Sequence, residues 1–185
     1  MIRLEDVLIK LVSFLNKGKF EYIIIGGIAA GVLGEPRTTG DIDVDILLDK
    51  DNISGFLDKA KEAGFKVNKQ RSIERAKNTG IFNIDYEDYH VDLIIASIDL
   101  EKEAFRRKKA ITICGLKTFF PTPEDLILLK IIPGRPQDII DAEKVVIRNR
   151  AKLDIKYLED WARKLSDEAE DMQIYNALKK LLLKA

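Results

Sequence analysis

Short apolar runs and helical repeats alternate along the first part of the chain. Leucines and valines from Leu4 to Leu15 recur at helical spacing, and the continuous apolar run from Phe20 to Ile25 is typical of a buried strand. Asp41 to Leu48 alternates acidic and apolar residues with the period of two that a strand requires. The pattern predicts further strands at 81–84, 89–95, 109–114 and 117–120, and a helix from residue 52 to residue 63.

After Thr122 the pattern is helical. Apolar positions predict helices at 123–132, 137–148, 154–165 and 168–184, with a break at Pro133-Gly134. Strands mixed with helices, followed by helices alone, indicate an α/β or α+β core with a helical C-terminal part. We therefore expect a core at residues 1–121 and a helical part at residues 122–185 packed on it.

The composition fits one domain, or one domain with a helical appendage, in a chain of 185 residues. Lys plus Arg and Asp plus Glu each total 31, and this balance argues against a protein that coats nucleic acid by bulk charge. The apolar run from Tyr22 to Gly34 is too short to span a bilayer, and we expect no secretory signal. One cysteine and one histidine argue against a zinc site. We expect a soluble cytoplasmic protein with no membrane partner.

Three carboxylates, those of Asp41, Asp43 and Asp45, face the same side of one predicted strand. Like charges in a row repel one another, so a structural role is costly unless a cation compensates. Mg²⁺ binds oxygen ligands, commonly one or two carboxylates plus substrate phosphates, and two such ions can stabilise the attacking and leaving oxygens of phosphoryl transfer. The row therefore indicates a site for Mg²⁺, with Mn²⁺ as the alternative ion. The alternative interpretation is an edge strand with a solvated acidic face.

Gly26-Gly27 closes the predicted strand and opens a helix. Free backbone N–H groups at a helix start can hold a phosphate, and glycine lets a triphosphate approach the backbone closely. An ordinary tight turn is the alternative for a Gly-Gly pair alone. Strand, Gly-Gly, helix and acidic strand together predict a phosphate cradle beside a metal site.

These motifs resemble the nucleotidyltransferase superfamily typified by DNA polymerase β, in which Gly-Gly or Gly-Ser precedes an Asp-apolar-Asp strand. Here Gly26-Gly27 is followed, after a spacer, by Asp41-Ile42-Asp43-Val44. More narrowly, residues 37–43, Arg-Thr-Thr-Gly-Asp-Ile-Asp, look like the form found in small stand-alone nucleotidyltransferases and AbiEii-like type IV toxins. The resemblance extends over about residues 20 to 145. Asp45 and Pro133 depart from it, since the families commonly have an apolar residue and continuous helix there.

The resemblance implies a nucleotidyltransferase-like mixed sheet flanked by helices, and an enzyme that moves a nucleoside monophosphate from a triphosphate to an acceptor hydroxyl with release of pyrophosphate. Asp41 and Asp43 would be catalytic metal ligands, and the resemblance implies a third carboxylate on a later strand. Asp92 is the best match because it is a lone acid entering an apolar run. The implied triphosphate ligands are Gly26, Gly27, Arg37, Thr39 and Lys130, with Asp45, Asp138 and Asp141 as secondary site residues.

Several of these residues have alternative interpretations. Lys130 also fits a lysine whose stem covers apolar surface, and Arg37 fits either a phosphate ligand or a partner of the acids. Asp138 and Asp141, three apart on a helix, are expected to hold Lys130 or Arg135 in place, although capping explains Asp138 nearly as well.

The acceptor is open between RNA, a small hydroxylated molecule and a protein. The toxin-like resemblance favours RNA and an antitoxin-like protein partner. The basic run Arg106–Lys109 is expected to be a solvated helix end, with an RNA-facing surface as the alternative. His90 is expected to face solvent on the opposite side of the strand from Asp92. A non-catalytic nucleotide-binding or partner-binding module of the same fold is the rival to an enzyme.

Overall fold

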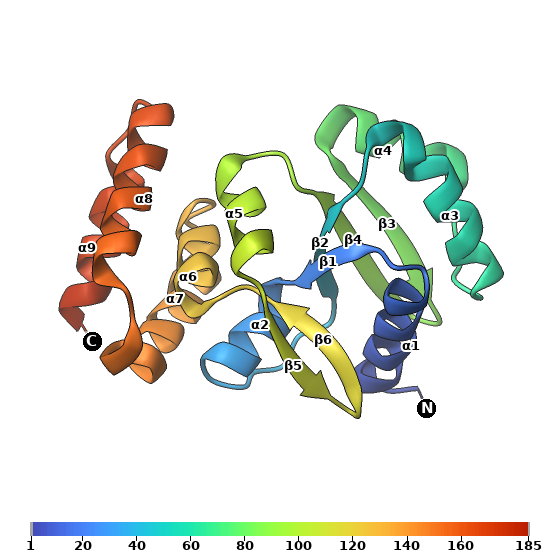
Figure 1. The fold of residues 1–185 in the computed structure, drawn as a ribbon, viewed down its shortest axis with the longest axis horizontal. Coiled ribbons are helices and arrows are strands. Elements are labelled where there is room, and N and C mark those ends of the chain that lie inside the picture. Colours follow the sequence, from blue (N-terminus) through green and yellow to red (C-terminus); the bar gives the residue numbers. More distant parts are fainter. Residues whose placement is uncertain (1, 185) are drawn as a thin grey trace.

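A mixed four-stranded sheet lies at the centre of the computed structural model, which describes residues 2–184. Its strand order is β1-β2-β4-β3, where β2 and β4 are parallel and the other neighbours are antiparallel. The strands are β1 (Glu21–Ile24), β2 (Ile42–Leu47), β3 (Ile81–Tyr86) and β4 (Tyr89–Ile95). The predicted fold class, a mixed sheet flanked by helices, is confirmed (Figure 1).

One face of the sheet is apolar and packs on helices α1 (Leu4–Lys17) and α3 (Ile53–Glu62). Phe56 of α3 lies edge-on against Phe82 of β3, with 5.5 Å between ring centroids. Helix α4 (Lys69–Thr79) packs on β3, the edge strand. This burial follows from the period of two along the strands, which sends their apolar residues to one side.

The opposite face of the sheet is covered only in part. Helix α5 (Asp99–Arg107) buries Ala104 and Phe105 against Ile23 of β1. At the end of this face nearest the start of helix α2 (Gly26–Leu33), strands β2, β4 and β3 present polar side chains, those of Asp43, Asp92 and Asn83, whereas Ile94 and Ile81 lie further along it. The sheet therefore offers an open polar surface next to the start of α2.

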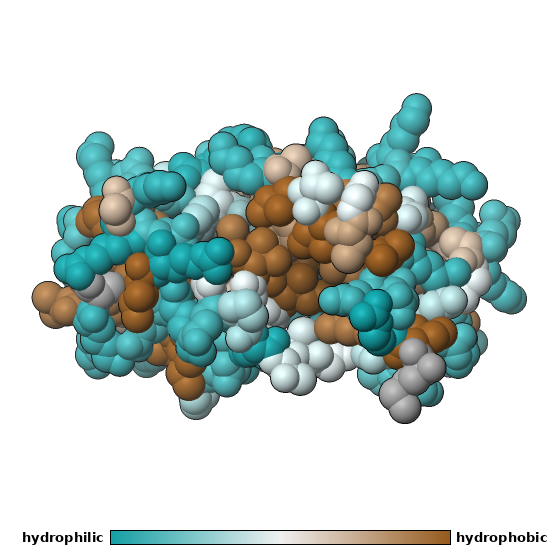
Figure 2. Space-filling view, turned by 90° about the horizontal axis from the view of Figure 1, so that it is seen from below, coloured by the Kyte–Doolittle hydropathy of each residue, from teal (hydrophilic) through white to brown (hydrophobic). Residues whose placement is uncertain are grey.

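A two-stranded hairpin, β5 (Lys109–Ile113) and β6 (Leu116–Phe120), lies along β1, where Tyr22 and Phe119 meet with 5.6 Å between ring centroids. The strands predicted at 109–114 and 117–120 are thus present, and they pair as a hairpin. Its partly buried apolar residues are Ile111, Ile113, Leu116 and Phe119. Figure 2 views the molecule from the side on which Figure 1 draws this hairpin, and shows apolar residues gathered near the middle of that face.

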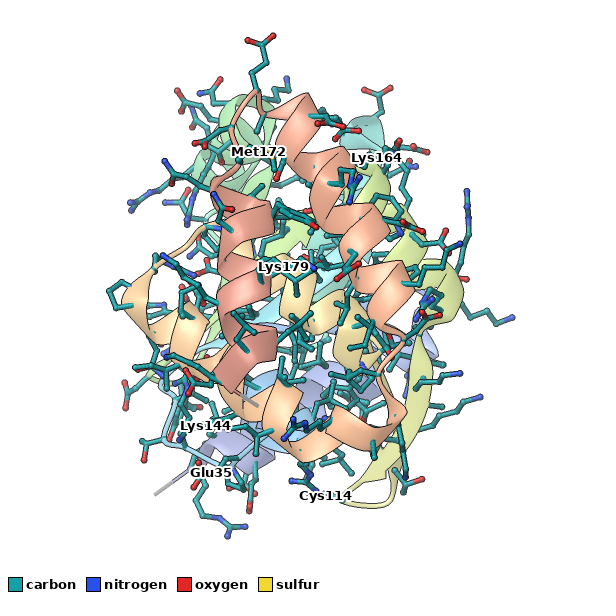
Figure 3. The ribbon with its side chains drawn as sticks, turned by 90° about the vertical axis from the view of Figure 1, so that its left-hand side faces the viewer. Glu35, Cys114, Lys144, Lys164, Met172 and Lys179 are labelled. Carbon is teal, nitrogen blue, oxygen red and sulfur yellow. The ribbon has the colours of Figure 1, made fainter. Side chains whose placement is uncertain are left out.

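Helices follow the hairpin to the end of the described chain, as the pattern predicts. They are α6 (Pro123–Ile131), α7 (Pro136–Asn149), α8 (Ile155–Glu168) and α9 (Gln173–Lys184), and short 3₁₀ turns lie at Lys50–Asn52 and Arg150–Lys152. Figure 1 shows these helices to the left of the sheet, and α1, α3 and α4 to its right. Lys179 of α9 lies between α8 and α9 on their outer side (Figure 3). Below them in the same view, Lys144 of α7 forms an ion pair with Glu35, with 2.7 Å between Nζ and the carboxylate oxygen.

One buried apolar cluster runs from α1 through the sheet to α9. Residue 121 therefore separates a part with strands and helices from a part with helices alone, and both parts share this core. As a domain boundary, residue 121 stays a prediction. Among residues 2–184, no helix has the length and apolar character needed to cross a membrane.

Candidate active site

A cavity of about 560 Å³ opens between the polar face of the sheet and helices α6 and α7. It lies where β1 ends, β2 begins and β4 passes, and the loop before β2 forms part of its rim. Most residues predicted for the site line this one cavity. They are Gly26, Gly27, Arg37, Thr39, Asp41, Asp43, Asp92, Lys130 and Asp138.

The two glycines at the start of α2 leave no room for side chains. Gly26 has a φ of +63°, and a Cβ atom there would collide with the Asp43 carboxylate. A Cβ at Gly27 would lie 2.7 Å from Thr39 Oγ1 and 3.1 Å from Arg37 Nη2. The N-cap residue Ile25 makes no capping hydrogen bond through its side chain, which leaves first-turn N–H groups for another acceptor. This is the arrangement that a phosphate cradle needs.

Asp43 and Asp92 stand side by side on neighbouring strands, because β2 and β4 pair in parallel with these two residues in register. Burial raises the pKa of Asp43, and the nearby charges of Asp92 and Asp41 raise it further, whereas Lys130 opposes the shift. Asp41 lies exposed just before β2. The three predicted acids thus line the same cavity, where like charges already disfavour ionisation of Asp43.

The carboxylates could bind a metal ion whose remaining ligands come from a substrate. Within residues 2–184, no group of three His, Cys, Asp or Glu side chains is close enough together to hold an ion. Mg²⁺ usually binds through one or two carboxylates and completes its shell with phosphate and water oxygens. Asp43 and Asp92, adjacent on an open cavity that the glycine cradle also lines, fit that kind of site.

Asp45 differs from the acids before it on the strand. It is 1% exposed, does not line the cavity, and neither of its carboxylate oxygens has a hydrogen-bond partner. Burial raises its pKa well above the usual range, and the charges of Glu101 and Asp43 add to the shift. Its register partner on β1, Ile23, packs under α5, so Asp45 points into the part of the face that α5 covers. Its carboxylate is therefore not accessible from the cavity.

Basic residues from α6 and from the turn between α6 and α7 form the opposite wall. Lys130 is 7% exposed, and its Nζ lies 2.8 Å from Asp138 and 3.2 Å from Asp141. Arg135 donates to Asp138 at 2.5 Å. Burial opposes ionisation of Asp138, but the hydrogen bonds from Arg135 and Lys130 outweigh it and lower the pKa. Asp138 thus pairs with both Lys130 and Arg135, which agrees with the interpretation that the acids of this helix hold these residues in place.

Arg37 joins the loop before β2 to α7. Its Nε and Nη2 donate to the two oxygens of Asp141 at 2.8 and 2.9 Å. Arg37 therefore pairs with an acid, Asp141 of α7, and because it also lines the cavity, its role as a phosphate ligand stays a prediction. The planar fork of arginine matches a carboxylate in two places, so this contact fixes the loop that leads into Asp41.

The basic run Arg106–Lys109 is largely neutralised by acids of the same chain. Its first three residues make ion pairs, Arg106 with Glu103, Arg107 with Glu124 and Asp125, and Lys108 with Glu21. The guanidinium of Arg107 also stacks on the ring of Tyr157, 3.7 Å from its centroid. Arg107 therefore connects α5 to α6 and α8, whereas Arg106 and Lys109 are exposed, as expected for a solvated helix end.

Sequence reasoning misplaced one residue of this face and missed another. His90 and Asp92 lie on the same side of β4, because residues two apart in a strand share a face; the expected opposite orientation of His90 is wrong. Arg75 of α4 reaches the face and lies 3.6 Å from Asp92. No helix was predicted at α4, since its buried positions are only Ser72 and Ala76 and give no apolar period.

Comparison with protein families gives a match over nearly the whole chain. The model of the family described as "Nucleotidyltransferase of unknown function (DUF6036)" matches residues 3–183. The chain belongs to this nucleotidyltransferase family. The superfamily resemblance drawn from the Gly-Gly and Asp-x-Asp motifs is thereby confirmed. The search of curated proteins returns no match for it.

Solved structures of several nucleotidyltransferases share the fold. An antigenic nucleotidyltransferase-like protein from Paracoccidioides brasiliensis is 18% identical with a TM-score of 0.59, over 98% of this chain and 88% of that one. The solution structure of the antibiotic-resistance factor ANT(2'')-Ia is 15% identical with a TM-score of 0.61, over 90% and 94%. The lincosamide antibiotic adenylyltransferase LnuA, bound to lincomycin, is 15% identical with a TM-score of 0.53, over 78% and 96%.

Proposed function

We propose that this nucleotidyltransferase family member is an active, Mg²⁺-dependent enzyme. It would transfer a nucleoside monophosphate from a nucleoside triphosphate to an acceptor hydroxyl and release pyrophosphate. The observation that carries the proposal is the contact between the side-chain-free cradle at Gly26 and the carboxylate of Asp43, with Asp92 in register beside it. A phosphate site and a metal site then share one cavity.

In this proposal Asp43 and Asp92 would hold the metal ion, and Asp41, at the exposed edge of the site, would be a further ligand. Mn²⁺ is the alternative ion. The metal supplies charge neutralisation for the phosphates during transfer. In the transfer itself, the acceptor oxygen bonds to the α-phosphorus, the bond from that phosphorus to the bridging oxygen breaks, and pyrophosphate leaves with the electron pair. The acceptor hydroxyl loses its proton to water or to Asp92. Positioning and electrostatics supply most of the rate in such reactions.

The triphosphate would lie between the cradle and the basic wall. Backbone N–H groups at Gly26 and Gly27 would donate to its phosphates, and Lys130 would approach them from α6 across the cavity. Thr39 lies beside Gly27 and fixes the width of the cradle. Because Asp138 and Asp141 already hold Lys130, this lysine is positioned before the nucleotide arrives.

A small hydroxylated acceptor has the better support. Two of the similar structures are the lincosamide adenylyltransferase LnuA bound to lincomycin and ANT(2")-Ia in complex with adenylyl-2"-tobramycin. Three of the four residues in the densest basic run pair with acids of this chain, which weakens the electrostatic case for an RNA acceptor there. An RNA acceptor, an antitoxin-like partner and a cytoplasmic location stay predictions from the sequence.

Thermal melts with Mg²⁺ alone, ATP alone and both together test this proposal. Bare carboxylates repel a bare triphosphate, so each ligand should strengthen binding of the other, a coupling of typically about 1–3 kcal/mol. A ligand at a hundredfold excess over its Kd stabilises the native state by about 2.7 kcal/mol, or several degrees in Tm. A joint shift larger than the sum of the two separate shifts is expected, and additive shifts would contradict the shared site.

Release of pyrophosphate separates an enzyme from the rival interpretation, a non-catalytic nucleotide-binding module. The enzyme should release pyrophosphate from ATP in the presence of Mg²⁺ and an acceptor. A joint melting shift without pyrophosphate release from any tested acceptor would favour the module.

A further inference from the structure

The open face of the sheet continues beyond Asp92, away from the glycine cradle and Lys130. Two residues of β3, Asn83 and Asp85, lie on it, because they pair in register with Asp92 and His90 of β4. Arg75 reaches the same face from α4. We call Asn83, Asp85, His90 and Arg75 the polar strip. The elements that carry it, β3, β4 and α4, lie on the side of the sheet away from α6 to α9 in Figure 1.

Hydrogen bonds order the strip. His90 Nδ1 lies 2.5 Å from Asp85 Oδ1, which leaves Nε2 of the ring directed away from that bond. Arg75 Nη1 donates to the side-chain oxygen of Asn83 at 3.3 Å and lies 3.6 Å from Asp92. The backbone carbonyl of Asn83 accepts from Ser72 of α4 at 3.0 Å, which anchors the helix that carries Arg75.

The side chains of the strip are nevertheless accessible. Those of His90 and Arg75 are 70% and 42% exposed, and that of Asp85 is 33% exposed. The strip thus combines fixed geometry with free hydrogen-bonding groups, next to the acid that borders the reaction cavity.

The geometry of in-line transfer indicates where the acceptor must bind. If the phosphates that leave lie against Gly26 and Lys130, an attacking oxygen in line with the departing bond must enter from the other side of the α-phosphorus. That side borders Asp92 and the polar strip. The acceptor would therefore bind on this part of the sheet.

We propose that the polar strip is the acceptor subsite, and that it binds a small neutral or cationic molecule carrying several hydroxyl groups. The proposal rests on the proposed function. Hydroxyl groups both donate and accept, which matches the mixture of Arg75 and Asn83 amide donors with the Asp85 carboxylate. The charges of Asp85, Asp41 and Asp92 act on His90, and Arg75 pairs with Asp92, so the acids on this side disfavour a polyanion such as RNA.

Transfer from α-labelled ATP to a fixed panel tests the subsite. The panel contains tobramycin, lincomycin and sorbitol as hydroxyl-rich molecules, total tRNA, and a peptide with serine and tyrosine. The variants are Arg75→Gln and Asn83→Ala, and Arg71→Gln is the matched control because Arg71 is an exposed arginine on the same helix outside the strip. Each variant is also melted with Mg²⁺ and ATP together.

We expect label on at least one hydroxyl-rich molecule. Arg75→Gln and Asn83→Ala should raise its KM by about tenfold, with the KM for ATP and the joint melting shift unchanged, whereas Arg71→Gln matches the wild type. Transfer to tRNA or peptide alone, no transfer at all despite a joint shift, or an unchanged acceptor KM in both variants would overturn the subsite. Loss of the joint shift in the wild-type protein would instead overturn the proposed function, and the subsite with it.

Discussion

The backbone of Gly26 lies so close to the carboxylate of Asp43 that a methyl group at position 26 would occupy the space of that carboxylate. The Gly26→Ala variant should therefore displace Asp43, and we expect it to lose nearly all transfer activity. It should also lose about 1–2 kcal/mol of stability from the positive φ.

Gly80→Ala is the control for that variant. Gly80 has a φ of +72°, and a Cβ there would meet no atom within 4 Å. The Gly80→Ala variant should therefore lose a similar amount of stability and keep full specific activity. Equal activities for the two variants, measured with equal folded fractions, would contradict a role for the Gly26 contact.

Neutralising the acids should abolish activity without unfolding the protein. Asp41→Asn and Asp43→Asn are each expected to lower the transfer rate at least about a hundredfold. Burial and the neighbouring Asp92 already raise the pKa of Asp43, so removing its charge should leave the melting temperature unchanged or higher. Asp51→Asn, at an exposed acid outside the cavity, is the control. If Asp43→Asn lowers the melting temperature but the folded protein keeps its specific activity, the metal-site assignment is refuted.

Asp45→Val should stabilise the protein by about 1–3 kcal/mol near neutral pH, since it removes a buried carboxyl whose oxygens have no partner. The folded-state pKa of Asp45 lies well above its unfolded value, so ionisation destabilises the fold. The wild type should lose stability relative to the variant as the pH rises from below the unfolded pKa through the folded one. Urea titrations at several pH values measure the difference. A constant difference across pH would show that Asp45 is ionised at little cost.

Lys130→Ala should be destabilising as well as inactivating. It leaves Asp138 and Asp141 without a buried cation, and breaking such a pair costs about 3–5 kcal/mol. Lys144→Ala, which removes an exposed pair with Glu35, should cost less than about 1 kcal/mol. The joint shift with Mg²⁺ and ATP, taken from each variant's own melting midpoint, should shrink only at position 130. An undiminished shift there would remove Lys130 from the triphosphate site.

His90 is the single histidine of the chain, so its ring gives an unambiguous NMR signal. The hydrogen bond and charge of Asp85 raise the pKa of His90. Its contribution to stability is therefore complete below the unfolded pKa and is lost as the pH rises through the folded one. Asp85→Asn should lower the pKa in an NMR titration, whereas Asp88→Asn, at an exposed acid of the adjacent turn, should leave it nearly unchanged. Equal effects of both substitutions would refute a specific pair.

Much of the site was predictable from local patterns. Gly26, Gly27 and the acids of β2 lie within one short stretch, and the period of two along the strand places Asp41 and Asp43 on one face. The spacing of acids along α7 likewise indicated partners for Lys130, which the structure contains.

What sequence reasoning could not provide depends on tertiary packing. Asp45 continues the same alternation as Asp43, and only the position of α5 makes one acid accessible to the cavity and the other buried. Arg75 lies on a helix with too few apolar positions to show a period, and its approach to Asp92 depends on how α4 meets the edge strand. Neither fact has a signature in the local sequence.

The two-point contact between Arg37 and Asp141 joins residues 104 positions apart. During synthesis, the acidic strand and the glycine cradle leave the ribosome well before α7 does. A nascent chain that ends at residue 121 thus carries the predicted metal ligands but not the helix that fastens their loop. Under the proposed function, transfer activity should accordingly begin only once α7 has been made and has docked on the core.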